Sequence, residues 1–386
     1  MEYVNSQHIL ETIEEGGEKP TRSVIAHELG LSRAAVSILT SDLISLKLVE
    51  EDGTPAKPDG RGRPGNPLRL DCSYWKVLGA SLQSDGWQVV VTDLSGKILD
   101  VVSFPLDAVT PDCMIDTLVS GLKAMLEKWN GHPFLPGVGV GVPGVVDTST
   151  GTIEFAYDFG WDSPVGIAGP VGDALGMSVF VQNRYILEGI AEYKYANPEK
   201  VKDMVYIGIG SGIRSAIFVD GRLVKGSIFS AGRLSHIQVE EQGRLCTCGR
   251  HGCLYTVAND SALQEWYSSF LGAGDSARLS ALAVTALADV GYPAACQAVD
   301  KVASFVLKAV LIISDVLNPR LMVFGGPVGD CHRLVSSLAR GIAENKAKNP
   351  YMNLNVRRCS IKRYGSARGA ASLVIEKKLQ LLRDGR

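Results

Sequence analysis

The chain lacks any apolar run long enough to cross a membrane. Its longest apolar stretch, from Val302 to Val316, is interrupted by Lys308 and Asp315, whereas a membrane-spanning helix needs about 20 predominantly apolar residues. The first twenty residues contain acidic side chains and no apolar segment of the kind found in secretory signal peptides. The sequence therefore predicts no association with a membrane.

Excess charge and a disulfide framework are also missing. The 39 Lys and Arg residues nearly balance the 41 Asp and Glu residues, so any contact with nucleic acid must come from a local patch. Eight cysteines in 386 residues are too few for a disulfide scaffold, and we expect a reducing cytoplasm. The length and the hydrophobic fraction of 46% predict a globular protein of two or three domains.

Cysteine and histidine are instead concentrated in one short segment. His236, Cys246, Cys248 and Cys253 lie close together in the chain. Three thiolates and one imidazole complete the tetrahedral shell that zinc prefers in proteins. Because protein atoms take all four positions, such a site is structural and leaves no place for a metal-bound water.

Residues 5–70 have the pattern of a winged helix-turn-helix. We expect a first helix over residues 5–15, a second that Thr21 caps and Gly30 ends, and a third that Ser32 caps. The third helix repeats apolar residues at helical spacing, and the turn before it is short and contains glycine. Strands expected near residues 48–51 and 68–70 flank a loop rich in glycine and proline, which we interpret as the wing.

The third helix and the wing are the expected DNA contacts. The outer face of that helix should enter the major groove, and arginines on the wing suit a narrow, A·T-rich minor groove. Residues 1–70 hold eight Lys and Arg against eleven Asp and Glu, so affinity should depend on the wing and on two copies of the domain. The predicted DNA-binding residues are Ser32, Arg33, Ala34, Ser37, Ser41, Arg61 and Arg63.

The rest of the chain repeats one α/β plan. Residues 77–99 and 204–224 each read as a hairpin unit with tight turns. Residues 138–142 and 321–324 are apolar runs that end at glycine, as buried parallel strands do. Two copies of one unit imply two lobes with a cleft between them, which is a common location for a ligand.

Several motifs together resemble one family. They are the helix-turn-helix, the His/Cys segment, Val142-Pro143-Gly144 and the glycine runs at 60–64, 208–212 and 325–326. Over nearly its whole length the chain is similar to a transcriptional regulator of the ROK family (repressors, open reading frames, sugar kinases). The resemblance implies an α/β fold: a winged helix-turn-helix at 1–70, followed by an actin-like, two-lobed part. Lobe 1 spans 71–183, completed by about 363–386, and lobe 2 spans 184–362 with the zinc-binding segment.

The resemblance also implies where kinase chemistry is lost. In the family's sugar kinases the first phosphate loop reads Asp-x-Gly-Gly-Thr, and this chain has Ser81-Leu82-Gln83-Ser84-Asp85. The family's catalytic base is the Asp of an Asn-Asp pair, which here is Asn183-Arg184. A guanidinium cannot act as a base at neutral pH. We therefore expect no enzymatic activity; the alternative is an active ATP-dependent sugar kinase with an appended DNA-binding domain.

The implied ligand pocket has changed its charge. Arg184, Arg233 and Tyr255 stand where the family has carboxylates. In one interpretation the pocket binds an anionic sugar derivative, which arginine grips through two hydrogen bonds. In the other it binds no ligand, and the arginines pair with acids such as Glu188 or Glu192. The predicted ligand-binding residues are Gly144, Asn183, Arg184, Arg233, His236 and Tyr255.

These expectations combine into one predicted function. The chain would be a cytoplasmic transcriptional regulator, a repressor of carbohydrate genes, that carries structural zinc. It would act as a homodimer or homotetramer on a palindromic operator with A·T-rich flanks. A sugar or sugar-derived effector would bind in the cleft and favour one arrangement of the lobes. A regulator that answers to a protein partner, with a closed cleft, is the other alternative.

Overall fold

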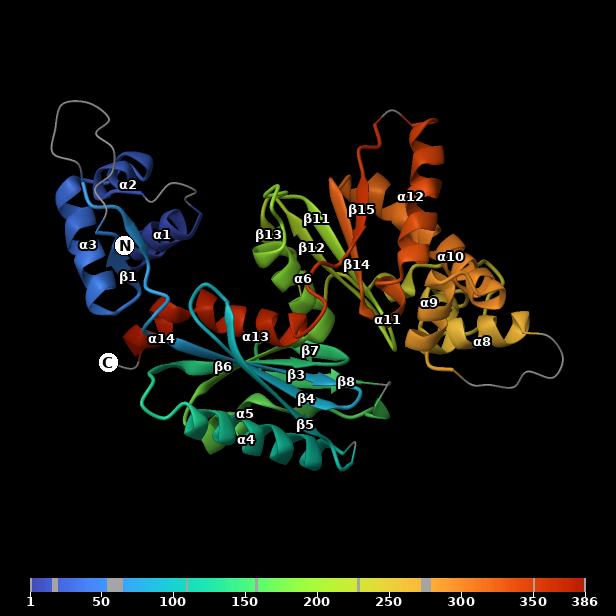
Figure 1. Cartoon of the computed structure of the whole chain (residues 1–386), viewed down its shortest axis with the longest axis horizontal. Coiled ribbons are helices and arrows are strands. Elements are labelled where there is room, and N and C mark those ends of the chain that lie inside the picture. The colour runs from blue at the N-terminus through green and yellow to red at the C-terminus, as the bar shows by residue number, and fades with distance from the viewer. Residues whose placement is uncertain are drawn as a thin grey trace.

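The computed structural model describes residues 2–15, 20–53, 65–108, 110–156, 159–227, 230–271, 279–349 and 351–384. It has a small N-terminal head and two α/β lobes, each built on a five-stranded sheet (Figure 1). Within these residues, no helix combines the length and the apolar character needed to cross a membrane. The division of the chain at about residues 70 and 183 stays a prediction.

The head contains the three helices and the hairpin expected from the sequence. Thr21 caps the second helix by accepting a hydrogen bond from the Val24 amide, and Ser32 caps the third by accepting one from the Ala35 amide. Gly30, with φ at +65°, makes the turn between these helices. The elements are α1 (Glu2–Glu15), α2 (Arg22–Glu28), α3 (Arg33–Ser45), β1 (Val49–Glu51) and β2 (Leu68–Leu70).

The sheet of lobe 1 has the strand order β10-β6-β3-β4-β5, with β3 parallel to β6 and antiparallel to β4. Alternate residues of β3 face opposite sides, so Leu78, Ala80 and Leu82 pack in the core that α4 completes. A small sheet, β7-β8-β9, adjoins it. The elements are β3 (Lys76–Gln83), β4 (Gly86–Thr92), β5 (Ile98–Pro105), α4 (Pro111–Lys128), β6 (Phe134–Val142), β7 (Val145–Asp147), β8 (Thr152–Phe155), β9 (Val165–Gly166), α5 (Ala168–Leu175) and β10 (Ser178–Asn183).

The sheet of lobe 2, in the order β13-β12-β11-β14-β15, repeats this plan. Alternate residues of β11 pack against α10 on one face and against α6 on the other. The elements are α6 (Arg184–Tyr195), β11 (Met204–Ile209), β12 (Ile213–Val219), β13 (Arg222–Leu223), a 3-10 turn (Leu234–His236), α7 (Tyr255–Ala258), α8 (Asp260–Phe270), α9 (Ala281–Asp289), α10 (Pro293–Leu317), β14 (Leu321–Gly325), α11 (Gly326–Gly329), α12 (His332–Lys346) and β15 (Asn355–Arg358).

Helix α13 (Gly365–Glu376) crosses the middle of the molecule and packs on both the lobe 1 sheet and α6 (Figure 1). Glycines make these close approaches possible. A Cβ on Gly139 would lie 1.9 Å from the Ala370 carbonyl oxygen, and one on Gly369 would lie 2.0 Å from the Leu187 carbonyl oxygen. Helices α6 and α13 therefore join the two lobes with backbones in near contact.

The head is docked on lobe 1 by the C-terminal helices. One hydrophobic core contains Ile9 and Leu43 of the head together with Val374 and Leu379 of α13 and α14 (Lys378–Asp384). Lys378, 1% exposed, forms an ion pair with Glu14 of α1, and Trp75 donates a hydrogen bond to the Leu46 carbonyl at 2.8 Å. The head and lobe 1 therefore share one continuous core.

Candidate functional site

Helix α3 turns its apolar residues into the head and leaves its other face open. Ser32 is engaged locally, because its Oγ accepts a hydrogen bond from the Ala35 backbone N–H at 3.1 Å. Ile38, which our reading of the sequence missed, lies on this face with 64% of its surface exposed. The sequence contained a signal for this position, because the helical spacing that buries Val36 and Leu39 turns Ile38 to the other face. The predicted residues exposed on this face are Arg33, Ala34, Ser37 and Ser41.

The predicted wing residues Arg61 and Arg63 lie outside the described residues. The strands at the base of this loop are described, and Arg22 ties one of them, β1, to the helices. Its guanidinium lies 2.7 Å from a Glu51 carboxylate oxygen and donates to the Thr40 hydroxyl at 2.9 Å. The strand from which the loop departs is therefore held against α2 and α3.

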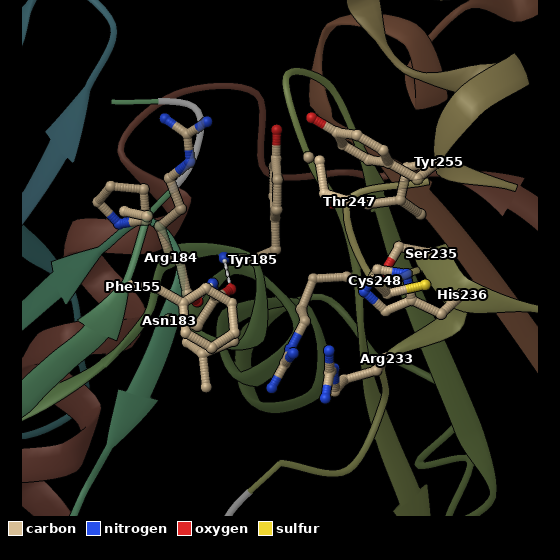
Figure 2. Close-up of a pocket in the computed structure, with 17 residues that line it drawn as sticks. Phe155, Asn183, Arg184, Tyr185, Arg233, Ser235, His236, Thr247, Cys248 and Tyr255 are labelled. Carbon is tan, nitrogen blue, oxygen red and sulfur yellow. Dashed lines mark hydrogen bonds between the residues drawn. The ribbon is translucent and has the colours of Figure 1, made fainter. Parts of the chain in front are cut away.

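A pocket of about 160 Å³ lies between the two lobes (Figure 2). It also contains Phe155, Tyr185 and Arg214, which our reading of the sequence did not select. Among the described residues, no Asp or Glu lines it. The structure brings to this pocket all six residues predicted for it: Gly144, Asn183, Arg184, Arg233, His236 and Tyr255.

Asn183 fixes the lobe 1 wall of the pocket. Its side-chain oxygen caps α6 by accepting a hydrogen bond from the Tyr185 amide at 2.9 Å, and its side-chain nitrogen donates to the Gly144 carbonyl at 2.7 Å. Gly144 has φ at +81°, and a Cβ there would lie 2.1 Å from the Phe155 carbonyl oxygen. The wall therefore needs glycine and asparagine at these places for its own geometry.

Arg184, which stands in place of the expected catalytic base, is the first residue of α6 and follows Asn183 of the lobe 1 wall. Its guanidinium donates a hydrogen bond to the Ser211 hydroxyl at 3.0 Å in the turn between β11 and β12. It also lies over the Tyr185 ring, 5.0 Å from the ring centroid. Arg184 is 8% exposed, so the start of α6 and the glycine turn of lobe 2 are connected through a buried side chain.

The acids proposed as partners for the pocket arginines have other contacts. Glu192 forms an ion pair with Arg357 at 2.9 Å. Glu188 accepts a hydrogen bond from the Tyr206 hydroxyl. Burial raises the pKa of Glu188, while Tyr206 and the charge of Arg184 act in the opposite direction. Glu188 thus partly compensates the positive charge of the Arg184 guanidinium.

Arg214 and Arg233 are neighbours on the lobe 2 wall. Burial, and to a smaller extent the charge of Arg233, lower the pKa of Arg214 to about 10. This value is still well above neutral pH, so the Arg214 guanidinium carries a positive charge. The sequence placed Arg233 in the pocket, but Arg214 lies within a strand pattern that gave no sign of its role.

The four residues of the His/Cys segment gather at the edge of the same pocket. Their ligand atoms all lie within 4.8 Å of one another. The Cys246 sulfur is 3.6 Å from Nδ1 of His236, and the Cys248 sulfur is 3.6 Å from that of Cys253. A tetrahedron with metal–sulfur bonds of about 2.3 Å has edges of about 3.8 Å, so the cluster can hold a metal ion.

The residues of the cluster also have suitable chemistry. Burial, with the charges of Arg233 and Arg250, lowers the pKa of His236 and favours the neutral imidazole that metals require. With Nδ1 of His236 directed to the cluster, Nε2 is left for the pocket or a hydrogen-bond partner. The cluster thereby connects the metal ligands to the pocket wall.

A helical head with a short hairpin, two lobes built on one repeated α/β plan and a His/Cys cluster beside the cleft together define the class of protein to which this chain belongs. The chain belongs to the ROK family, whose sequence profile matches residues 81–377. The xylose repressor of Caldicellulosiruptor bescii is 22% identical over 392 residues, covering 98% of this chain and 97% of its own. The DNA-binding transcriptional dual regulator NagC of Escherichia coli is 23% identical over 378 residues, covering 96% and 92%.

Two solved structures show the same fold. A ROK family transcriptional regulator described as a homologue of the E. coli Mlc protein superimposes with a TM-score of 0.83, at 22% identity, covering 99% of this chain and 97% of its own. A ROK family glucokinase from Streptomyces griseus, bound to glucose and AMPPNP, gives a TM-score of 0.68 at 21% identity, covering 77% of this chain and 98% of its own. The predicted two-lobed, actin-like fold with an N-terminal helix-turn-helix is confirmed.

Proposed function

We propose that this chain is a DNA-binding transcriptional regulator of carbohydrate metabolism, acting as a repressor whose cleft binds a small sugar-derived effector. The observation that carries the proposal is the head: the outer face of α3 is open, and the head shares one core with the lobe that forms half of the pocket. The names of the relatives, a xylose repressor and a DNA-binding regulator, support it. All eight cysteines are free, which fits a reducing cytoplasm.

Arg33 is expected to read sequence at the start of α3. An arginine in this position can donate two hydrogen bonds to guanine, each such pair being worth about 1–3 kcal/mol of discrimination. We expect Arg33→Ala to reduce affinity for an operator selected from a random duplex pool by about tenfold or more per half-site, with little effect on random DNA. Fluorescence anisotropy with both duplexes measures the ratio.

Arg69→Ala is the matched control for this substitution. Arg69 is exposed on β2 of the same head and pairs with Glu50 at 2.8 Å, so its removal changes the charge of the head equally. An equal loss of affinity for operator and random DNA in Arg33→Ala would contradict the assigned role.

We propose no enzymatic function, because the described residues at the phosphate loop and at the position of the base do not suit kinase chemistry. At the first phosphate loop Ser81 is fully buried, and its hydroxyl pairs with that of Ser366 at 2.7 Å and accepts a hydrogen bond from Gln83 at 2.9 Å. These polar groups satisfy one another. The position of the base is taken by Arg184, which is bound to Ser211.

We therefore expect no phosphoryl transfer from ATP to any common hexose. Loss of a general base alone typically reduces the rate by 10²- to 10⁴-fold, and the altered phosphate loop reduces it further. A coupled assay of ADP release with the full chain, a hexose panel and Mg²⁺ measures this, with a known ROK glucokinase as the positive control. Sugar-dependent ADP release above the background would support the alternative of an active kinase.

We propose that the His/Cys cluster holds structural zinc. Three sulfurs and one nitrogen at the observed separations match its tetrahedral preference and leave no position for a bound water. Bound there, the metal would supply no chemistry; it would order the segment that carries His236 and, through it, Arg233. The ion would thus maintain one wall of the pocket.

The proposed coupling runs through the helices that join the lobes. Helix α6 begins at the pocket with Arg184 and packs along α13, and α13 and α14 share the core of the head. An effector that binds one arrangement of the lobes more tightly would shift the population of that arrangement. In a homodimer or homotetramer this would change the spacing of two heads on a palindromic operator with A·T-rich flanks.

The site favours regulation by a small effector over regulation by a protein partner with the cleft closed. The pocket has open volume, hydroxyl groups from Ser235, Thr247 and Tyr255 for sugar hydroxyls, and three arginines without a lining carboxylate. The positive charge favours an anionic sugar derivative. An effect of sugars or their acidic derivatives on operator affinity tests this proposal, and no effect of any of them would favour the protein partner.

A further inference from the structure

We propose that Arg214 and Arg233 together form a subsite for the anionic group of the effector, either a carboxylate or a phosphate. This inference rests on the proposed function, because it assumes that the cleft is the effector site. It adds a residue that the sequence did not indicate, and it assigns the anion to this pair of arginines, not to Arg184.

Backbone pairing brings the two arginines together from distant parts of the sequence. The Ser215 amide donates a hydrogen bond to the Gly232 carbonyl at 3.0 Å. Gly232 has φ at +80°, and a Cβ there would lie 2.1 Å from the Ser215 carbonyl oxygen. Arg214 precedes Ser215 and Arg233 follows Gly232, so each guanidinium extends from a residue next to this contact. Both line the same pocket.

Arg214 is buried without an acceptor. It is 7% exposed, and its Nε is buried with no hydrogen-bond partner among the described residues. No ion pair to Arg214 occurs in the part of the chain that the structure describes. Burying a charged group is strongly unfavourable unless it is paired. An anionic ligand in the pocket would supply the missing acceptor.

Partly buried arginines elsewhere in the protein show how these side chains are usually compensated. Arg357 pairs with Glu192, and Arg358 pairs with Asp330 at 3.0 Å. Arg368 donates to the Gly96 carbonyl. By contrast, the charged group that affects Arg214 is another positive charge, that of Arg233. An anion bound between these two guanidinium groups would be attracted by both and would offset their mutual repulsion.

Arg184 is excluded from this subsite by its own contacts. Its guanidinium is bound to Ser211, lies over the Tyr185 ring, and is attracted by Glu188. Figure 2 shows the side chains of Arg184 and Arg233 extending toward opposite sides of the pocket. The anion-binding wall is therefore the one that carries Arg214 and Arg233.

The test compares matched ligands on the full chain. Isothermal titration calorimetry uses glucose, glucuronate, glucose 6-phosphate and inorganic phosphate, against wild type, Arg214→Met, Arg214→Lys and Arg233→Met. We expect wild type to bind inorganic phosphate and at least one anionic sugar more tightly than glucose, by on the order of tenfold to a hundredfold. Arg214→Met and Arg233→Met should lose this preference, and Arg214→Lys should keep part of it.

A second readout separates a ligand-binding role from a structural one. Replacing a buried, unpaired charge by an apolar side chain of similar length is neutral or stabilising. Without ligand, Arg214→Met should therefore unfold at the same temperature as wild type or higher, whereas loss of a structural contact would lower it. Arg222→Met, an exposed arginine on the neighbouring strand β13, is the matched control and should change neither result.

The outcomes distinguish this inference from the proposed function. Saturable binding of phosphate or of either anionic sugar that Arg214→Met abolishes supports the subsite, and the two anionic sugars decide between carboxylate and phosphate. If no anion in the panel binds, or if anions bind equally well to Arg214→Met, the subsite is wrong. The proposed function would still stand in that case if a neutral sugar changed operator affinity.

Discussion

Replacing Cys253 by serine is expected to release zinc and to disorder the lobe 2 wall of the pocket. The Cys253 sulfur is fully buried and contacts that of Cys248, so it is an inner ligand of the cluster. Structural zinc contributes on the order of 10–16 kcal/mol to small domains. The zinc content should fall from about one ion per chain to near zero, and the unfolding temperature should fall by about 10 °C or more.

Elemental analysis and calorimetric unfolding measure these two changes. Cys113→Ser is the matched control, because Cys113 lies on α4 of lobe 1, away from the cluster, and it should keep its zinc. Since the core of the head is separate from that of lobe 2, Cys253→Ser should still bind DNA below its unfolding temperature but lose the response to an effector. Full zinc occupancy in Cys253→Ser would exclude the cluster as the metal site.

The features predicted well from the sequence are those with local signals. Helices α2 and α3 begin one residue after Thr21 and Ser32, the capping residues that were expected to start them. The His/Cys cluster was predicted because its four ligands lie between residues 236 and 253, so a short loop can bring them together. The pocket residues came from the resemblance to the ROK family, which placed them on motifs spread along the chain.

The features that were missed depend on tertiary contacts. Arg214 lies within the apolar pattern of β12, and its meeting with Arg233 results from the pairing of Ser215 with Gly232. The docking of the head depends on Lys378 and Glu14, which are 364 residues apart. Composition and periodicity contain no information about such pairings. They also could not show that Arg184 would bind Ser211 in the turn between β11 and β12.

The head is docked on lobe 1 and not held by a flexible linker, which affects how a change in the lobes would reach it. A head on a flexible linker would transmit little of a change in the lobes, whereas this one is attached through a continuous apolar core and the buried Lys378. Any rotation of lobe 1 against lobe 2 therefore also moves α3. Arg184 directly follows Asn183 of the lobe 1 wall and binds Ser211 beside the pocket; under the proposed function, a ligand that altered this contact would change the position of α3.

Removing both wing arginines, Arg61→Ala with Arg63→Ala, is expected to weaken DNA binding for every sequence. These arginines are predicted to lie on the wing, and β1, the strand before it, is tied to α2 by Arg22. Each arginine that contacts phosphate contributes about 0.9 to the slope of log K against log salt concentration. For a dimer with four such arginines the slope should flatten by about 3 to 4 units, and affinity at physiological salt should fall on the order of 10²- to 10³-fold.

Anisotropy titrations from low to high salt, on the operator and on a random duplex, measure both quantities. Lys123→Ala with Lys128→Ala is the matched control: it removes two positive charges from α4, on the side of lobe 1 opposite α13 (Figure 1), and should leave the slope unchanged. A head with more acids than bases needs a local source of positive charge to bind DNA at all. An unchanged salt slope in the wing variant would therefore move that source to α3, where Arg33 is the exposed arginine among the described residues of the helix.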